Sequence, residues 1–314
     1  MEIRTGGDAW HILGVENAPT ESRSIQSVIR KTRKSVRIAP VRASTSSSWL
    51  LSYTGMTETR SPAIQAPPIL WRQAEVLAIF AETPRVKSLL LRVAGWPGHQ
   101  PGQYVDVRLT AEDGYQAERS YSLASAPQPD LPQREIVQLT IEYMDEGEVS
   151  PYLANPLRLG DRVEIRGPIG DDFIWTATGG EPLVLVAGGT GIVPIMSMLR
   201  HRALQQSRPP VWLLDSSRSY DEIVYREELD RLQAAGDGLR IFHTLTRNQP
   251  PGWPGFRRRI DRSMLRDVMP PPEAGSIAYV CGPAEMVETV ATALVDLGYD
   301  RRRVKTERFG PTGP

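Results

Sequence analysis

Residues 119–122, Arg-Ser-Tyr-Ser, place a cation, a flat aromatic ring and two hydroxyl groups next to one another. Arginine can donate two parallel hydrogen bonds to a phosphate, and the face of a tyrosine ring can stack on a planar heterocycle. This set suits an anionic, aromatic ligand such as a flavin nucleotide. The same residues also fit an ordinary strand with one buried ring, so they are weak as a signal when taken alone.

Residues 188–191, Gly-Gly-Thr-Gly, have the composition of a phosphate-binding turn and directly follow the apolar run 183–187. Glycines after the first strand of a parallel sheet let the backbone approach a phosphate, and the next helix presents free N–H groups. Pro194 is well placed in the first turn of that helix. The spacing is not the usual G-x-G-x-x-G, and a tight turn without a ligand is the alternative. Together with residues 119–122, however, the turn predicts an enzyme that passes a hydride from a nicotinamide to a flavin.

Composition excludes several classes of protein. The 314 residues can hold two domains, and a net charge of zero gives no reason to expect a nucleic-acid or lipid partner. No run of apolar residues is long enough for a membrane span. Cys281 is the single cysteine, so the chain forms no intrachain disulfide and cannot alone ligate an ordinary iron–sulfur cluster. The four histidines show no ligand spacing, so no metal site is expected, and a reduced, cytoplasmic protein is predicted.

The N-terminal segment differs from the rest of the chain. Residues 22–57 contain no acidic side chain and are rich in Ser, Thr, Arg and Lys. Such a segment buries too little apolar surface to offset the entropy of ordering it, so we expect residues 1–66 to be a disordered extension. A targeting peptide is the alternative, but the acidic Glu2, Asp8 and Glu16 argue against it. An extension without function, with Met56 as the natural start, is favoured.

From about residue 70 the chain alternates short strands with Gly, Pro and Asp turns. Strands are expected at residues 75–80, 86–93, 104–109, 136–143 and 162–166. This pattern predicts a small antiparallel Greek-key β-barrel, which we assign to residues 67–177 as the flavin domain.

After Gly180 the pattern changes. Residues 183–187, 211–214 and 277–281 are continuous apolar runs, which are typical of parallel strands covered on both faces. Helical patterns lie between them. Residues 180–314 are therefore predicted to be an α/β domain with an open parallel sheet that binds NAD(P).

Six segments occur in the order seen in the ferredoxin–NADP reductase superfamily. They are residues 119–125 (RSYSLAS), 147–153 (GEVSPYL), 167–170 (GPIG), 188–191 (GGTG), 279–283 (YVCGP) and 307–310 (ERFG). From about residue 70 to its end, the chain resembles the compact bacterial members and the reductase modules of multicomponent oxygenases. The resemblance implies a flavoprotein that passes a hydride from NAD(P)H to FAD and then electrons to an acceptor.

The resemblance also implies the contacts of the flavin. Arg119 would bind the pyrophosphate, Tyr121 would pack against the isoalloxazine, and Ser122 would lie near its N5. Residues 147–150 would hold the pyrophosphate with backbone amides, which in this family goes with FAD rather than FMN, and Phe309 would cover the other face of the ring. The implied flavin-binding residues are Arg119, Ser120, Tyr121, Ser122, Gly147, Glu148, Val149, Ser150 and Phe309.

The implied nucleotide site follows the strands of the α/β domain. Residues 188–191 would cradle the phosphates, and Cys281 and Glu307 would lie beside the nicotinamide C4. A lone cysteine at the end of a buried strand is usually a small core residue, but the Gly-Pro that follows Cys281 favours the functional interpretation. The implied nucleotide-binding residues are Gly188, Gly189, Thr190, Gly191, Ser216, Arg218, Cys281, Gly282 and Pro283, and the implied catalytic residues are Ser122, Cys281 and Glu307.

The choice between NADPH and NADH depends on the residues after the second apolar run. Asp215 is placed where an acid would bind a ribose 2′-hydroxyl and favour NADH. Ser216 and Arg218 suit the 2′-phosphate of NADPH, and the acid can turn away toward Arg240 or Arg247. NADPH is favoured, and NADH stays open.

The expected acceptor is a separate protein. With a single cysteine the chain lacks the fused plant-type ferredoxin domain of many oxygenase reductases, so a ferredoxin or an oxygenase component is expected to take the electrons. A free flavin or quinone reductase, and a non-catalytic flavin- or nucleotide-binding electron-transfer subunit, are the alternatives.

Overall fold

The computed structural model describes residues 2–6, 9–13, 69–128, 133–155, 157–176, 180–205 and 208–309. Near the N-terminus it contains an antiparallel pair of strands, β1 (Glu2–Gly6) and β2 (Ala9–Leu13). This pair of strands is not among the elements expected from the sequence. The rest of residues 1–66 lies outside the described residues, so the expected disorder of that segment stays a prediction.

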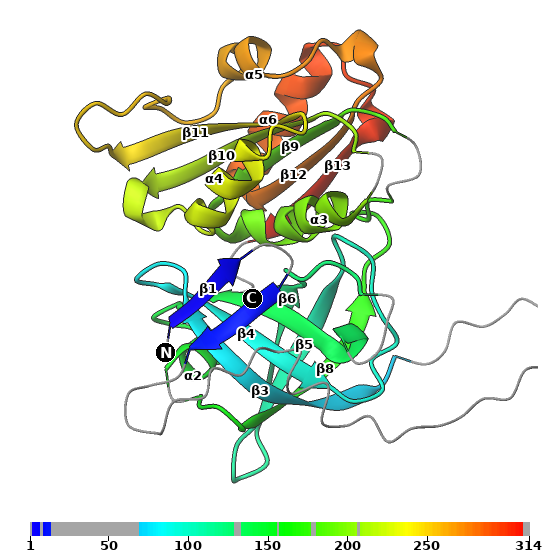
Figure 1. Ribbon diagram of the computed structural model, residues 1–314, viewed down its shortest axis with the longest axis vertical. Helices are drawn as coiled ribbons and strands as arrows, with labels where there is room; N and C mark the ends of the chain where they lie inside the picture. The colour runs from blue at the N-terminus through cyan, green and yellow to red at the C-terminus, as the bar shows by residue number, and fades with distance from the viewer. Residues whose placement is uncertain are drawn as a thin grey trace, which may run out of the picture. The chain divides into compact units, whose positions relative to one another are not determined.

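The described residues between 69 and 176 form a six-stranded antiparallel sheet in the order β6-β5-β8-β3-β4-β7 (Figure 1). The sheet closes on itself because Leu123, directly after β6, bridges Leu139 of β7. The predicted antiparallel barrel is thereby confirmed, and its strands all lie within residues 67–177. The strands are β3 (Trp71–Ala81), β4 (Val86–Val93), β5 (Tyr104–Thr110), β6 (Gln116–Ser122), β7 (Ile136–Glu142) and β8 (Arg162–Ile169), with the short helices η1 (Gln133–Glu135) and α2 (Ser150–Ala154).

Alternation of side chains explains why these segments are strands. In β3, Ala74, Val76 and Ala78 are buried while the residues between them are partly exposed. Successive side chains of a strand point to opposite faces, so the apolar set lines the barrel interior. β6 lacks this signal because Ala117 is its one aliphatic residue, so the sequence offered a strand at residues 119–122 only as an alternative interpretation.

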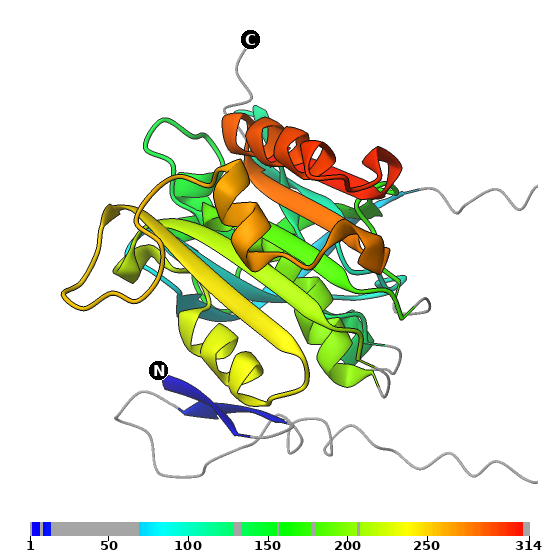
Figure 2. The same cartoon turned by 90° about the horizontal axis from the view of Figure 1, so that it is seen from above.

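The second sheet is parallel throughout, in the order β11-β10-β9-β12-β13. Figure 2 shows α3 and α4 on one face of it and α5 and α6 on the other. The predicted α/β domain is confirmed. Its elements are β9 (Leu183–Gly188), η2 (Gly189–Gly191), α3 (Ile192–Leu204), β10 (Val211–Ser219), η3 (Tyr220–Glu222), α4 (Arg226–Ala234), β11 (Leu239–Asn248), α5 (Arg262–Val268), η4 (Pro272–Ala274), β12 (Ile277–Pro283), α6 (Ala284–Asp296), η5 (Arg301–Arg303) and β13 (Val304–Phe309).

The central strand β9 contributes to two separate cores. Leu183 and Leu185 pack with α3 and α4, while Val184 and Val186 pack with α5 and α6. A strand covered on both faces needs apolar side chains at every position, which is the continuous run found in the sequence. The edge strands β11 and β13 carry polar residues on one face or at their ends, so the sequence pattern did not predict them.

Helix α3 lies against the barrel domain, and Arg200 makes several polar contacts there. Its guanidinium donates to the Ala124 carbonyl at 2.8 Å and to Gln138 Oε1 at 3.0 Å, both in the barrel domain. It also binds both carboxylate oxygens of Glu228 in α4, at 2.8 and 2.7 Å. One turn earlier, Ser197 Oγ donates to the Ser125 carbonyl. Helix α3 is therefore bonded to the barrel along one face.

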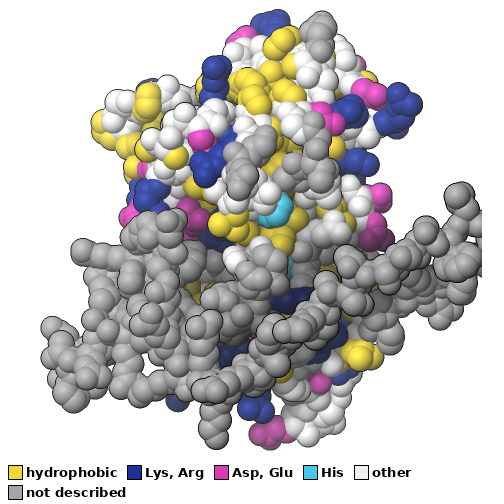
Figure 3. All heavy atoms as spheres, turned by 45° about the vertical axis from the view of Figure 1, so that its right-hand side comes forward, with side chains coloured by type: hydrophobic (Ala, Val, Ile, Leu, Met, Phe, Trp, Pro, Cys, Tyr) yellow, Lys and Arg dark blue, Asp and Glu magenta, His cyan; other side chains and the backbone are white. Residues whose placement is uncertain are grey.

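The surface of the described residues carries charges of both signs. Figure 3 shows Lys and Arg side chains interspersed with Asp and Glu on the face in view. Among the described residues, no helix combines the length and the apolar character needed to cross a bilayer. The same residues hold no group of three or more His, Cys, Asp and Glu side chains that could bind a metal ion.

Replacing Arg200 by Ala should lower the free energy of unfolding by about 3 kcal/mol or more, because the largely buried Glu228 carboxylate would lose its cation. Arg302 is the matched control, since it pairs with Asp300 at the surface, and Arg302→Ala should cost less than about 1 kcal/mol. Urea denaturation followed by tryptophan fluorescence measures both losses. Small and equal losses would show that the Arg200 contact does not hold the domains together.

Candidate functional site

The glycine turn lies at the carboxyl end of β9, between that strand and α3. Gly191 packs so closely on β12 that an added Cβ would overlap the Cys281 carbonyl group. Gly189 has a φ of +55°, a conformation that residues with a side chain rarely adopt. The tight turn leaves the first N–H groups of the helical segment facing the edge of the sheet, where an anion can bind them.

The barrel contributes β6, whose last residues enter the same region. Tyr121 is half-buried, and burial raises the pKa of its phenol, so the hydroxyl stays protonated. Ser122 is buried, and among the described residues its Oγ has no hydrogen-bond partner. A buried hydroxyl without a partner costs free energy unless a ligand or water bonds to it. The Ser122 hydroxyl is therefore available to a ligand, since the described residues do not bond to it.

Arg119 and the loop after β7 meet at the surface of the barrel. Arg119 Nη2 lies 3.5 Å from Glu148 Oε2, and the Tyr115 hydroxyl donates to the other Glu148 oxygen at 2.7 Å. Ser150 Oγ accepts from the Met144 N–H at 3.2 Å, which folds the loop at residues 147–150 back on the end of β7. Arg119 is half-exposed, so exchanging the carboxylate for a phosphate requires little rearrangement.

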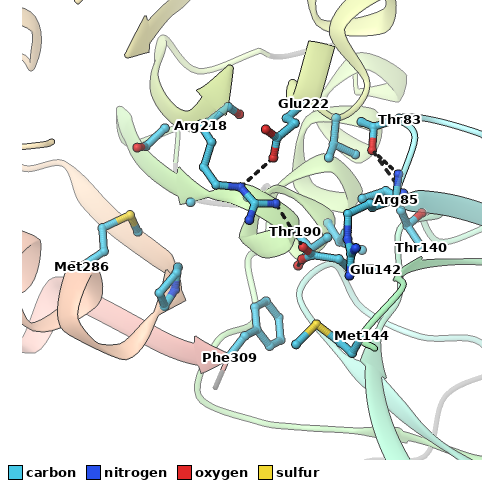
Figure 4. A pocket seen from close by; sticks show the side chains of 18 of the residues that line it. Thr83, Arg85, Thr140, Glu142, Met144, Thr190, Arg218, Glu222, Met286 and Phe309 are labelled. Atoms are coloured by element: carbon cyan, nitrogen blue, oxygen red, sulfur yellow. Dashed lines mark hydrogen bonds and ion pairs between the residues drawn. The ribbon is translucent and has the colours of Figure 1, made fainter. Parts of the chain in front are cut away.

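These segments line one cleft of about 1330 Å³ that both sheets border (Figure 4). Its mixture of aromatic, hydroxyl and guanidinium groups suits a nucleotide cofactor. Fifteen of the residues singled out from the sequence line it, namely Arg119, Ser120, Tyr121, Ser122, Gly147, Glu148, Val149, Ser150, Gly188, Gly189, Thr190, Ser216, Arg218, Pro283 and Phe309. The structure therefore brings the two groups of sequence motifs together.

Four predicted residues, Gly191, Cys281, Gly282 and Glu307, are not among the residues that line the cleft. Cys281 of β12 is paired in register with Glu307 of β13, and its Sγ lies 3.9 Å from Glu307 Oε2. Burial raises the pKa of the Glu307 carboxyl to about 7. Burial, and then the neighbouring carboxylate, raise the pKa of the Cys281 thiol well above its ordinary value. Near neutral pH, Cys281 is a neutral thiol beside a carboxyl group that is close to half-ionised.

Asp215 is not among the residues that line the cleft. It is buried, and its Oδ2 lies 3.1 Å from His243 Nδ1 of β11 and accepts from Ser217 Oγ at 3.4 Å. Arg240 and Arg247 were expected as possible partners of this carboxylate, whereas in the structure its partner is His243. Ser216 and Arg218, on either side of Ser217, do line the cleft.

Several cleft residues were missed from the sequence. Thr83 and Arg85 come from the turn between β3 and β4, Glu142 from the end of β7, and Met286 from α6 (Figure 4). None belongs to a recognisable motif. Arg247 lies at the end of β11 and Arg259 in the segment that follows it, and both line the cleft. They were missed because the sequence pattern did not predict β11, whose carboxyl end lies at the same sheet edge as that of β10.

The residues present fit FAD and a nicotinamide dinucleotide. The unpartnered Ser122 hydroxyl suits a ring nitrogen of a flavin, and the half-buried rings of Tyr121 and Phe309 suit the faces of an aromatic heterocycle. The glycine turn at the start of α3 suits a second phosphate group.

Comparisons with known families agree with this arrangement. Residues 92–173 match the family described as "Oxidoreductase FAD-binding domain", and residues 185–292 match "Oxidoreductase NAD-binding domain". The first match falls in the barrel and the second in the α/β domain.

Individual relatives cover most of the described chain. The ferredoxin--NAD(P)(+) reductase component of the naphthalene 1,2-dioxygenase/salicylate 5-hydroxylase systems of a Ralstonia species is 32% identical over 240 residues, which are 76% of this chain and 69% of that protein. The flavohemoprotein of Bordetella pertussis is 30% identical over 256 residues, which are 77% of this chain and 61% of that protein. The chain thus spans about two thirds of the length of these relatives.

A solved structure shows the same arrangement of domains. The FAD/NAD-binding domain of the nitric oxide dioxygenase from Vibrio cholerae superposes with a TM-score of 0.67 at 27% identity, over 76% of this chain and 99% of that one. With the two family matches and the relative at 32% identity, this likeness confirms the resemblance and both cofactor predictions, FAD and a nicotinamide dinucleotide. The chain therefore belongs to the ferredoxin–NADP reductase superfamily of FAD- and NAD-binding oxidoreductases.

Proposed function

We propose that the protein is an NADPH-dependent flavoprotein reductase that delivers electrons to a separate acceptor protein, a ferredoxin or an oxygenase component. The observation that carries the proposal is the shared cleft. The unpartnered hydroxyl of Ser122, from the barrel, and the glycine turn of the α/β domain line one space. The cleft is therefore suited to hold two ring systems against each other.

FAD bound in the cleft would supply the redox chemistry, since it accepts a hydride and releases electrons one at a time. The chain's own residues would position it. Arg119 would exchange Glu148 for the pyrophosphate, which is a bidentate acceptor for a guanidinium. Tyr121 and Phe309 would pack on the ring, and Ser122 Oγ would donate the hydrogen bond that it lacks within the described protein. These contacts contribute alignment, which is the main requirement of hydride transfer.

Cys281 and Glu307 would lie at the nicotinamide end of the site. The Cys281 thiol, held neutral by burial, would shape the pocket without acting as a nucleophile. The nicotinamide ring gains positive charge as it gives up a hydride. The ionised carboxylate of Glu307 would stabilise that charge.

Preference for NADPH is part of the proposal. Ser216 and Arg218 border the cleft, and so do Arg247 at the end of β11 and Arg259 in the segment after it. Guanidinium groups favour a 2′-phosphate over a 2′-hydroxyl. The acid that would have favoured NADH, Asp215, is bonded to His243 instead.

The separate acceptor is proposed from the single cysteine and from the relatives. A fused plant-type ferredoxin needs cysteine ligands that this sequence does not provide. The Ralstonia relative is named as the reductase component of a dioxygenase system and a hydroxylase system, which supports a separate acceptor for this chain. The expected cytoplasmic location stays a prediction.

The purified protein should be yellow, and NADPH added under argon should bleach it. Release of the bound flavin should identify it as FAD, and cytochrome c reduction should depend on added ferredoxin. Absorption spectroscopy and steady-state assays measure all three. Cytochrome c reduction that needs no carrier would favour a free flavin or quinone reductase, and a flavin that NADPH does not bleach would favour a non-catalytic subunit.

Ser122→Ala should slow reduction of the bound flavin by NADPH about 10²-fold, because it removes one hydrogen-bond donor positioned at the reacting ring. Flavin content and thermal stability should hold, since the hydroxyl makes no hydrogen bond within the described residues. Stopped-flow absorbance measures the rate. Ser276→Ala is the control, because Ser276 Oγ is likewise buried and unpartnered among the described residues but lies outside the cleft lining. A parental rate in Ser122→Ala would refute the role.

The kcat/KM for NADPH should rise as pH increases through about 7, and Glu307→Gln should lose that rise. Burial raises the Glu307 pKa to about 7, so the carboxyl group is protonated below that pH and ionised above it. The ionised form is the one that stabilises a cationic nicotinamide, and kcat/KM reports the pKa of the free enzyme. Assays with ferricyanide as acceptor give both profiles. A step near pH 7 that survives in Glu307→Gln would assign it to another group.

A further inference from the structure

Glu142, the last residue of β7, reaches from the barrel into the α/β side of the cleft (Figure 4). Its Oε2 accepts from Thr190 Oγ1 at 3.3 Å, and its Oε1 lies 3.6 Å from Arg218 Nη2. The side chain is 30% exposed, so water screens these contacts only in part. One carboxylate thus binds two groups of the α/β domain at once.

Both partners of Glu142 belong to the proposed nucleotide site. Thr190 is in the glycine turn that would cradle a phosphate, and Arg218 is the residue that would bind the 2′-phosphate of NADPH. The Glu142 carboxylate therefore occupies a place where the ligand would bring negative charge. Two anions cannot share these donors without strong repulsion.

Arg218 is held by a second carboxylate, but that one belongs to its own domain. Arg218 Nε donates to Glu222 Oε2 at 2.6 Å, and Ser219 Oγ donates to Glu222 Oε1 at 3.0 Å. This i,i+4 pair orients the guanidinium without crossing the cleft. Glu142, in contrast, belongs to the barrel and contacts Arg218 across the cleft. An entering nucleotide therefore has to displace Glu142 rather than Glu222.

A cation on the barrel side can receive Glu142 once it is displaced. Arg85 lies beside Glu142 in Figure 4. The pKa of Arg85 is raised, first by its hydrogen bond to Asp145 and to a smaller extent by the charge of Glu142. A side-chain rotation of Glu142 toward Arg85 would free Thr190 and Arg218 and keep the carboxylate near a positive charge.

We propose that Glu142 is an internal anion that competes with the phosphates of the dinucleotide for Thr190 and Arg218, and so sets both nucleotide affinity and the discrimination between NADPH and NADH. The inference rests on the proposed NADPH-dependent function. Glu142 weakens the binding of a ligand with a 2′-phosphate more than that of a ligand without one, because Arg218 contacts only the former. The preference for NADPH over NADH is thus reduced by a residue of the flavin domain, not by one of the nucleotide domain.

Isothermal titration calorimetry of the flavin-loaded protein with 2′,5′-ADP and with 5′-AMP tests this inference. Glu142→Gln should bind 2′,5′-ADP about fivefold more tightly, the range expected for a partly exposed ion pair, and 5′-AMP less than about twofold more tightly. The gain should shrink at high salt, which screens exposed charges. Glu142→Thr, which removes the charge with a residue suited to strands, should reproduce the gain if Glu142→Gln folds poorly.

Two control variants separate the contact from general charge. Glu146→Gln removes the same charge from the same cleft lining, but no described contact joins Glu146 to Thr190 or Arg218, so its affinity should stay within about twofold of the parent. In an Arg218→Ala background, Glu142→Gln should tighten 2′,5′-ADP by less than about twofold, because only the contact of Glu142 with Thr190 remains.

The outcomes are distinguishable. A parent protein that binds neither fragment overturns the proposed function, and the inference with it. A parent that binds both fragments while Glu142→Gln binds no more tightly overturns the inference alone. Equal tightening in Glu146→Gln also overturns it, because the effect would then be a bulk charge effect.

Discussion

The position of the cleft depends on one helix that is bonded at two places. Helix α3 begins directly after the glycine turn, and its residues Ser197 and Arg200, one turn apart, bind carbonyl groups of the barrel domain. Residues three apart on a helix lie on one face, so both point to the barrel. Because a helix is rigid over this length, the distance from the glycine turn to the barrel is fixed. The barrel side and the α/β side of the cleft are thereby held in one geometry.

The central strands could be predicted from the sequence almost to their ends. Residues 183–187 and 277–281 are apolar at every position, and the structure covers both faces of β9 and β12 with helices. No tertiary information is needed to recognise such runs. The edge strands β11 and β13 are different, because half of their surroundings is solvent or loop. Their polar residues carry no periodic signal, and only pairing with β10 and β12 defines them.

Site residues that belong to short sequence motifs could be predicted. Site residues that meet only through tertiary packing could not. The motifs around Ser122 and Gly189 come to one cleft as expected. Glu142 was not predictable, since its two partners lie in the other domain and meet it only after the domains pack. The orientation of Asp215 was likewise hidden, because His243 comes from a strand that the sequence pattern did not predict.

The buried thiol of Cys281 can be used to detect local opening of the parallel sheet. This thiol is fully buried beneath the close approach of Gly191, and it is the only one in the sequence. Thiolates rather than thiols react with alkylating reagents, and burial both hides this group and keeps it protonated. Labelling can therefore occur only when the end of β12 separates from its neighbours. The rate at which Cys281 is alkylated therefore measures how often the parallel sheet opens near the end of β12.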